Sequence, residues 1–101
     1  MRVSKKDKIN NEKLRETSSL LKAIAHPLRV SILHLLSINK NLSVTEIHKK
    51  LKIEQAVASH HLAILKSKNL VQIKREGKNV FYFIGNSKVI SLLSAIDKLL
   101  K

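Results

Sequence analysis

The segment EQAVASHHLAIL, residues 54–65, carries side chains that could contact the edges of DNA bases. Glutamine can bond adenine through two hydrogen bonds, serine can contact several bases, and histidine can donate to a guanine edge. At helical spacing, Ala58, Leu62 and Leu65 share one apolar face. The opposite face then presents small or hydrogen-bonding groups, namely Gln55, Ala56, Ser59 and His60. Taken alone, this pattern would also suit an ordinary amphipathic helix with a polar outer face.

Positive charge lies around this segment and not on it. The chain has a formal net charge of +13, yet residues 54–65 contain no lysine or arginine. Residues 40–52 and 66–84, on either side, are both rich in lysine. In protein–DNA complexes, contacts to phosphates set the position of the protein, whereas contacts to base edges set its sequence preference. The distribution therefore favours a charge-poor recognition helix between two basic clamps.

The overall composition limits the class of protein. A chain of 101 residues is the size of one small domain, and 44% hydrophobic residues is too many for a disordered tail. Twenty Lys and Arg against seven Asp and Glu indicate a polyanionic partner, for which nucleic acid is favoured over anionic lipid. The absence of cysteine excludes disulfides and thiolate chemistry, and it fits a reducing, cytoplasmic location. We expect neither a membrane span nor a secretory signal, because no apolar run is long enough.

Two helices are expected before the recognition segment. Residues 1–10 are predicted to be a flexible basic arm, and the apolar spacing over 11–25 predicts the first helix. Pro27 suits the first turn of a second helix, which runs to about Ser37. Val30 is expected to belong to the buried stripe of that second helix.

A helix-turn-helix is predicted at the centre of the chain. SVTE at 43–46 is a capping box, in which the serine hydroxyl and the glutamate carboxylate each accept a hydrogen bond from the other residue's backbone N–H. The helix that it starts reaches about Leu51. A turn at 52–53 then leads into the segment 54–65, and two helices joined by so short a turn form this motif.

A β-hairpin is predicted over residues 71–84. Val71 and Ile73 alternate with polar residues, and a turn follows at 76–79. Residues 80–84 are all apolar, so we expect both faces of this second strand to be covered. With the helices, the hairpin predicts a mainly α fold with a small β-hairpin, in one domain over residues 11–101.

The last helix, from Asn86 or Ser87 to about Leu100, has an apolar stripe that one small domain can hardly cover. We expect this helix and the first one to form a homodimer interface. The alternative is that the last helix folds back over the hairpin of its own chain. The expected interface residues are Leu14, Leu21, Val89, Leu92, Leu93, Ile96, Leu99 and Leu100.

Three stretches carry motifs that are fairly specific in combination: LKAIAHPLRVSILHLL, LSVTEIHKKLKIEQAVASHHLAILKSKNLV and REGKNVFYFI. With AHPLR in the first and SHHL in the second, the chain resembles the winged helix-turn-helix repressors of the ArsR/SmtB family over roughly residues 14–100. The resemblance implies a dimeric repressor of transcription that binds an imperfect palindrome in double-stranded DNA. On that pattern the DNA-binding residues are Gln55, Ala56, Ser59 and His60 in the major groove, Lys66 at the end of the same helix, and Arg75, Lys78 and Asn79 in the wing.

We expect no metal or thiol sensor and no cofactor. Sensing members of the family carry cysteines in the third helix or Asp and His in the last, but residues 43–51 have no Cys and 86–101 have only Asp97. No two of the five histidines have the i, i+4 spacing that would indicate chelation. We expect them to lie at the surface or beside helix caps: His26, His34, His48, His60 and His61. The sequence does not distinguish between a small-molecule inducer, a partner protein that displaces DNA, and the absence of any inducer.

Three other classes of protein fit the sequence less well. An enzyme is not expected, because the chain shows no nucleophile–base pair, Gly-rich phosphate loop or paired carboxylates. A winged helix that binds RNA would share the charge, but such proteins stack bases on aromatic residues. The three aromatic residues, Phe81, Tyr82 and Phe83, all lie in one strand, where at least one face should be core. A protein-interaction module would be recognised by DNA binding that ignores sequence and is lost with salt.

Glu54 stands where many family members have a serine at the cap of the recognition helix. Glutamate is a weaker cap, although its charge suits the positive helix end, and it would lie near phosphate. We therefore predict that Glu54→Ser lowers the Kd for duplex DNA in a titration at fixed salt. Unchanged or weaker binding would contradict this idea.

Overall fold

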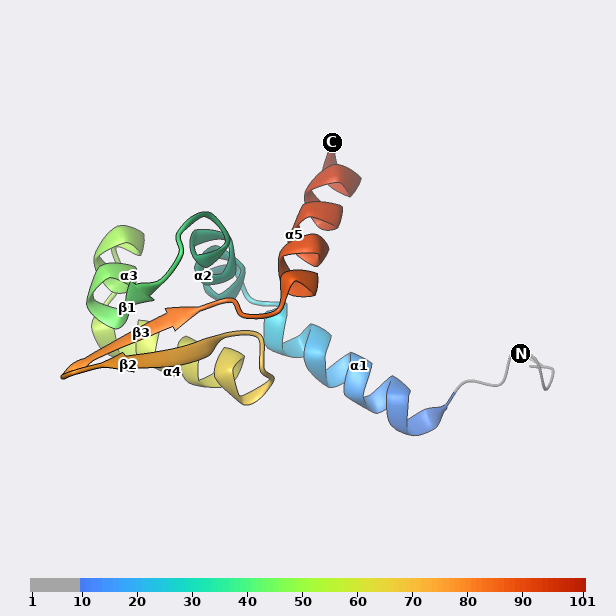
Figure 1. The fold of residues 1–101 in the computed structure, drawn as a ribbon. Coiled ribbons are helices and arrows are strands. Elements are labelled where there is room, and N and C mark those ends of the chain that lie inside the picture. Colours follow the sequence, from blue (N-terminus) through green and yellow to red (C-terminus); the bar gives the residue numbers. More distant parts are fainter. Residues whose placement is uncertain (1–9) are drawn as a thin grey trace.

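The computed structural model describes residues 10–101, which form five helices and a three-stranded antiparallel sheet (Figure 1). This confirms the predicted mainly α, winged helix-turn-helix fold and adds a short strand that the sequence pattern did not reveal. The elements in chain order are α1 (Asn11–Ile24), α2 (Pro27–Ile38), β1 (Leu42–Ser43), α3 (Val44–Leu51), α4 (Gln55–Ser67), β2 (Gln72–Glu76), β3 (Asn79–Phe83) and α5 (Ser87–Leu100).

Polar side chains fix where the helices begin. Asn10 is the only residue of the predicted basic arm among the described residues, and its Oδ1 accepts from the backbone N–H of Glu12 at 2.9 Å. The capping box at the start of α3 is confirmed, with Ser43 Oγ accepting from the N–H of Glu46 at 3.1 Å. In return, Glu46 Oε1 accepts from the N–H of Ser43 at 3.0 Å. Asn86 caps α5 as Asn10 caps α1, with its side chain accepting from a backbone N–H. Each such cap stabilises its helix by about 1 kcal/mol.

The turn between α3 and α4 is closed by backbone and side-chain hydrogen bonds. Lys52 adopts the left-handed conformation, with φ 56°, and ends α3. The N–H of Ile53 then donates to the carbonyl of His48 at 3.0 Å. The Nδ1 of His48 also lies 3.1 Å from the carbonyl oxygen of Ile53. These contacts satisfy carbonyls that the helix end leaves free, and they set the direction in which α4 begins.

The sheet has the strand order β1-β3-β2. Leu42 of β1 pairs with Tyr82 of β3, and Arg75 of β2 pairs with Val80 of β3. The predicted hairpin is therefore present, with β1 added on the far side of β3. A strand of two residues is too short to show alternation in the sequence, which is why β1 was missed.

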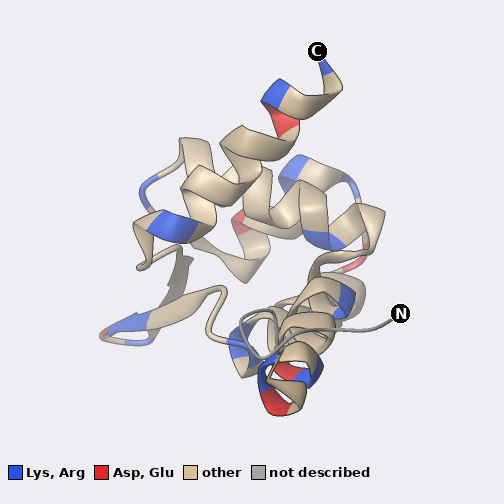
Figure 2. Ribbon diagram, turned by 90° about the vertical axis from the view of Figure 1, so that its right-hand side faces the viewer, with Lys and Arg blue, Asp and Glu red and all other residues tan. Residues whose placement is uncertain are grey.

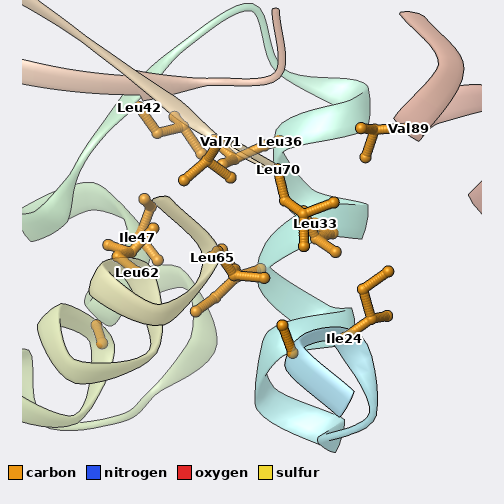
Figure 3. Close-up of a cluster of buried hydrophobic side chains, with 13 residues drawn as sticks. Ile24, Leu33, Leu36, Leu42, Ile47, Leu62, Leu65, Leu70, Val71 and Val89 are labelled. Carbon is orange, nitrogen blue, oxygen red and sulfur yellow. The ribbon is translucent and has the colours of Figure 1, made fainter. Parts of the chain in front are cut away.

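The core lies among α2, α3, α4 and the segment just before β2 (Figure 3). Ile32 and Leu33 of α2, Ile47 of α3 and Leu62 of α4 are all fully shielded from solvent. Burial of each such side chain contributes about 1.5–3 kcal/mol. Val30, which the sequence placed in this core, is 43% exposed, so that prediction is wrong. The apolar residues of α2 extend around the helix, and their spacing alone does not identify the buried side.

The two faces of β3 differ in environment. Tyr82 and Ile84 pack against the core, and Leu42 of β1 is part of that core. Phe81 and Phe83 alternate with them and point to the other side of the sheet. All of residues 80–84 are partly buried, so the expected cover of both faces is only partly met within this chain.

Helices α1 and α5 project away from the hairpin at the other end of the molecule (Figure 1). Leu14 and Leu21 of α1 are 47% and 54% exposed, and Leu99 and Leu100 of α5 are more than 80% exposed. Val89, in contrast, is buried in the core of its own chain, which leaves it almost no surface for a partner. Within residues 10–101, no single helix is long and apolar enough to cross a membrane; α1 and α2 pass that test only as a pair bent by 85°.

Candidate nucleic-acid interface

Helix α4 has one buried and one exposed face, as its sequence predicted. Ala58, Leu62 and Leu65 are completely buried and hold the helix against the core. The other side is exposed and presents, in order, Gln55, Ala56, Ser59, His60 and Lys66. Because the exposed side chains before Lys66 are uncharged or small, the helix backbone can approach a narrow groove closely. We call α4 the recognition helix.

The start of the recognition helix is open to an anion. Glu54 is its N-cap residue, but the Glu54 side chain makes no capping hydrogen bond. The N–H groups of the first turn and the helix dipole together make a helix N-terminus favourable for phosphate. The carboxylate of Glu54 is exposed, and the first turn of α4 contains no acidic residue. It would therefore oppose the approach of a phosphate that the backbone favours.

The hairpin places its charged residues at an exposed tip, far from α1 and α5 in Figure 1. Gly77 has φ +62°, and a glycine with positive φ at the first position of a two-residue turn is typical of a type II′ hairpin. Arg75, Lys78 and Asn79 are all exposed there. The structure thus brings the three predicted wing residues together at the tip of one hairpin.

One carboxylate neutralises part of this basic hairpin. Lys74 Nζ lies 2.8 Å from Glu76 Oε1, and both side chains are more than half exposed. An exposed ion pair of this kind adds at most about 1 kcal/mol to stability. Its larger effect is on the charge of the hairpin, because Glu76 neutralises Lys74. Arg75 and Lys78 make no ion pair within residues 10–101.

Further cations lie beside the recognition helix. Lys49 and Lys50 in the last turn of α3 and Lys52 in the turn are all exposed. The basic stretch 40–52 indicates a clamp here, but these three lysines could not be chosen from its pattern alone. Figure 2 shows Lys and Arg spread over the helices and the hairpin, with few acidic residues between them.

Arg29 of α2 joins three helices through its guanidinium. Its Nη1 donates to the backbone carbonyls of Ala23 at 2.9 Å and Lys22 at 3.3 Å, in the last turn of α1. Its Nε donates to Nδ1 of His61 in the recognition helix at 3.2 Å. The sequence did not predict this cluster, since Arg29 and His61 are 32 residues apart.

His61 is 6% exposed, which contradicts the prediction that all five histidines lie at the surface or beside caps. The pKa of His61 is lowered from its ordinary value, first by burial and then by the nearby His26, Arg29 and His60. His26 behaves as predicted: it is the N-cap of α2, and its Nδ1 accepts from the N–H of Leu28 at 3.1 Å. The rings of His26 and His61 also lie 4.4 Å apart.

The described residues contain no group of three or more His, Cys, Asp or Glu side chains that could hold a metal ion. The absence of a metal sensor stays a prediction.

The fold and motifs can be compared with known proteins. The model for "Bacterial regulatory protein, arsR family" matches residues 26–72, from the cap of α2 to the start of β2. An uncharacterized HTH-type transcriptional regulator of Methanocaldococcus jannaschii is 36% identical over 88 residues, which are 87% of this chain and 99% of that protein. This chain belongs to the ArsR family. As an ArsR-family protein it is a DNA-binding transcriptional regulator and not an enzyme.

Two more relatives of this ArsR-family regulator bear on its function. The transcriptional repressor PagR of Bacillus anthracis is 36% identical over 90 residues, which are 89% of this chain and 90% of PagR. The solution structure of the homodimeric winged helix-turn-helix DNA-binding domain Mb0332 from Mycobacterium bovis matches with a TM-score of 0.81. It is 28% identical, and the match covers 91% of this chain and 87% of that one.

The pair between Lys74 and Glu76 gives a prediction for this ArsR-family regulator. Glu76→Gln frees Lys74 and removes a negative charge from the hairpin, so it should tighten binding to every duplex. For each hairpin that contacts the DNA, the plot of log K against log salt should steepen by about one, as for one added phosphate contact, and affinity at 0.1 M salt should rise by a factor of up to about eight. Asp97→Asn, which breaks the pair with Lys101 on α5 and changes the net charge equally, is the control. Equal effects of both variants would show that only total charge matters.

Proposed function

We propose that the protein is a homodimeric, sequence-specific repressor of transcription that binds a site with imperfect twofold symmetry. Each recognition helix would enter a major groove, and each hairpin would contact the flanking DNA backbone. The observation that supports this most directly is the composition of the exposed face of α4. Gln55, Ser59 and His60 can hydrogen-bond bases, while Ala56 lets the helix approach closely. The segments before and after α4 carry exposed cations that would contact phosphates.

The exposed apolar residues of α1 and α5 support a dimer. Leu14, Leu21, Ile96, Leu99 and Leu100 are between 41% and 83% exposed, and Leu92 and Leu93 are partly buried beside them. Covering one exposed leucine stabilises an assembly by about 1.5–3 kcal/mol, so a set of this size favours self-association. The homodimeric state of Mb0332, which has a similar fold, points the same way. Val89 is not included, because its own chain already buries it.

Repression is inferred from the similarity to the repressor PagR. A regulator that acts on the genome would work in the cytoplasm. We further propose that this member senses no metal, since it has no cysteine and no candidate cluster of metal ligands within residues 10–101. No feature of the chain selects an inducer.

The proposal is tested by incubating the purified protein with fragmented genomic DNA of its source at about physiological salt and sequencing what it retains. Enrichment of a few sites with twofold symmetry is the expected result. Uniform recovery that vanishes with salt would overturn the proposal, and competition with RNA would then test the RNA-binding alternative.

The dimer can be tested with two leucine- or isoleucine-to-glutamate variants. Leu99→Glu would bury a charge in the proposed interface, so sedimentation should show a shift from dimer to monomer and at least a tenfold loss of DNA affinity. Ile38→Glu is the matched control, because Ile38 is 68% exposed at the end of α2 and outside the proposed interface. A dimeric Leu99→Glu protein would contradict this arrangement of subunits.

The division between recognition helix and clamps gives separate expectations for two groups of alanine variants. Gln55→Ala and His60→Ala should reduce discrimination between the selected site and other duplexes by about 1–3 kcal/mol for each lost base contact. Arg75→Ala and Lys78→Ala should weaken all duplexes alike and flatten the salt dependence by about one. Titrations of both duplexes at several salt concentrations measure the two effects. If all four variants behaved alike, the division would be wrong.

A further inference from the structure

The bond between Arg29 and His61 lies where the recognition helix meets the helices behind it. Arg29 Nε donates to His61 Nδ1 at 3.2 Å, while Arg29 Nη1 donates to the carbonyl of Ala23 at 2.9 Å. We call this set of contacts the Arg29–His61 joint. Through it, a single side chain of α2 fixes the last turn of α1 relative to the middle of α4.

The joint connects the two proposed roles of the protein. Helix α1 carries Leu14 and Leu21 of the proposed dimer interface, and α4 carries the exposed residues that would contact bases. His61 is buried, but it directly follows His60, which belongs to that exposed set. The two rings lie 5.2 Å apart with edge-to-face geometry. A change in the joint would therefore alter the angle between the recognition helix and the dimer axis.

The joint requires one protonation state of His61. A guanidinium only donates hydrogen bonds and keeps its proton at any physiological pH. Nδ1 of His61 must therefore be the unprotonated nitrogen, with the ring proton on Nε2. When the ring takes up a second proton, Nδ1 becomes a donor that faces another donor, and a cation is placed beside a cation. The bond must then break.

Among residues 10–101, none of the charges that act on His61 offsets this conflict. From α2, the groups that face it are His26, whose ring lies 4.4 Å away, and Arg29; from α4, it is His60. From α1, the nearest groups of the joint are the carbonyls of Lys22 and Ala23, which are already occupied by Arg29. All three side chains disfavour a charged His61, as does its burial, and together they lower its pKa.

We propose that the Arg29–His61 joint positions the recognition helix for DNA and that uptake of one proton by His61 releases it. His61 and Arg29 are then positioning residues that touch no base. The part of this inference that concerns DNA rests on the proposed function, whereas the release of the joint does not.

The sign of the pH dependence follows from the direction of the shift. The unfolded chain binds the proton near the ordinary value of 6.5, and the folded chain binds it only at lower pH. The contribution of the joint to stability is therefore complete above about pH 6.5 and is lost progressively as the pH falls below it. DNA affinity should fall at lower pH, as the folded protein itself takes up the proton.

The release of the joint is tested without DNA by NMR of the ¹⁵N-labelled protein between pH 8 and pH 5. At the upper end, His61 should be neutral with its proton on Nε2, and the Nε–H of Arg29 should give a slowly exchanging signal. Protonation of His61 and loss of that signal should share one midpoint, below 6.5. If His61 titrates while the Arg29 signal persists, or if the two midpoints differ, the joint is not released by the proton.

The effect on DNA is tested by comparing the wild type with His61→Asn, because every exposed histidine is retained in both. Asn Oδ1 occupies nearly the position of His Nδ1, so the variant can accept from Arg29 but cannot titrate. Protonated His60 could by itself strengthen binding, and the comparison cancels that effect. The affinity ratio of wild type to variant should fall below the midpoint by up to about tenfold per pH unit for each subunit that contacts the DNA, which is the limit for one linked proton per His61. A ratio that is constant from pH 8 to pH 5 would overturn the positioning role.

Two further variants distinguish loss of the joint from loss of an unrelated histidine. Arg29→Lys keeps the charge but cannot span the carbonyls and the ring, so its affinity should be low at pH 8 and nearly independent of His61 protonation. His34→Asn removes an exposed imidazole of α2 outside the joint, and its pH profile should match the wild type. The DNA used is the duplex enriched from genomic fragments. If no duplex is preferred at any pH, the proposed function fails while the NMR result still decides the joint.

Discussion

The guanidinium of Arg29 sets how the helices of this regulator lie relative to one another. A helix end leaves carbonyls without partners, and at the end of α1 two of them are satisfied by Arg29 from the next helix. The same planar group also reaches His61 of the recognition helix. Because the donors of a guanidinium form a rigid fork, the three partners cannot move independently. The contacts differ in this respect from the surrounding leucine core, which is strong but does not impose one direction.

A second constraint is the separation of charge from recognition. A net charge of +13 attracts any polyanion, and a lysine on the exposed face of α4 would add affinity for every sequence equally. Gln55, Ser59 and His60 instead offer contacts whose strength depends on the base. The exposed cations of the hairpin and of α3 would supply this general attraction from elements next to α4 in the sequence. On the proposed mode of binding, Glu54 and Glu76 would reduce the attraction at both places, so that the base contacts would decide more of the outcome.

Much of this arrangement could be predicted from sequence, because caps and apolar spacing are local. The capping box at Ser43 and the two faces of α4 were recognised from a few neighbouring residues. Contacts that depend on distant segments were not. A two-residue β1 has no pattern, and the positions of Val30 and Val89 show that an apolar stripe does not reveal whether its own chain or a partner covers it. His61 lies at the edge of the apolar face, and only the three-dimensional structure places Arg29 beside it.

The small core gives the joint its importance. The residues that are fully shielded come from α2, α3, α4 and the segment just before β2, whereas most of α1 and the end of α5 stand outside this core. In a single chain, α1 is therefore fixed chiefly near its last turn, by Ala23, Ile24 and the contacts of Arg29. If a second chain covers α1 and α5, the spacing between the two recognition helices is transmitted through that same turn. A regulator built in this way can lose its fit to a twofold DNA site through one hydrogen bond, without any loss of the helices themselves.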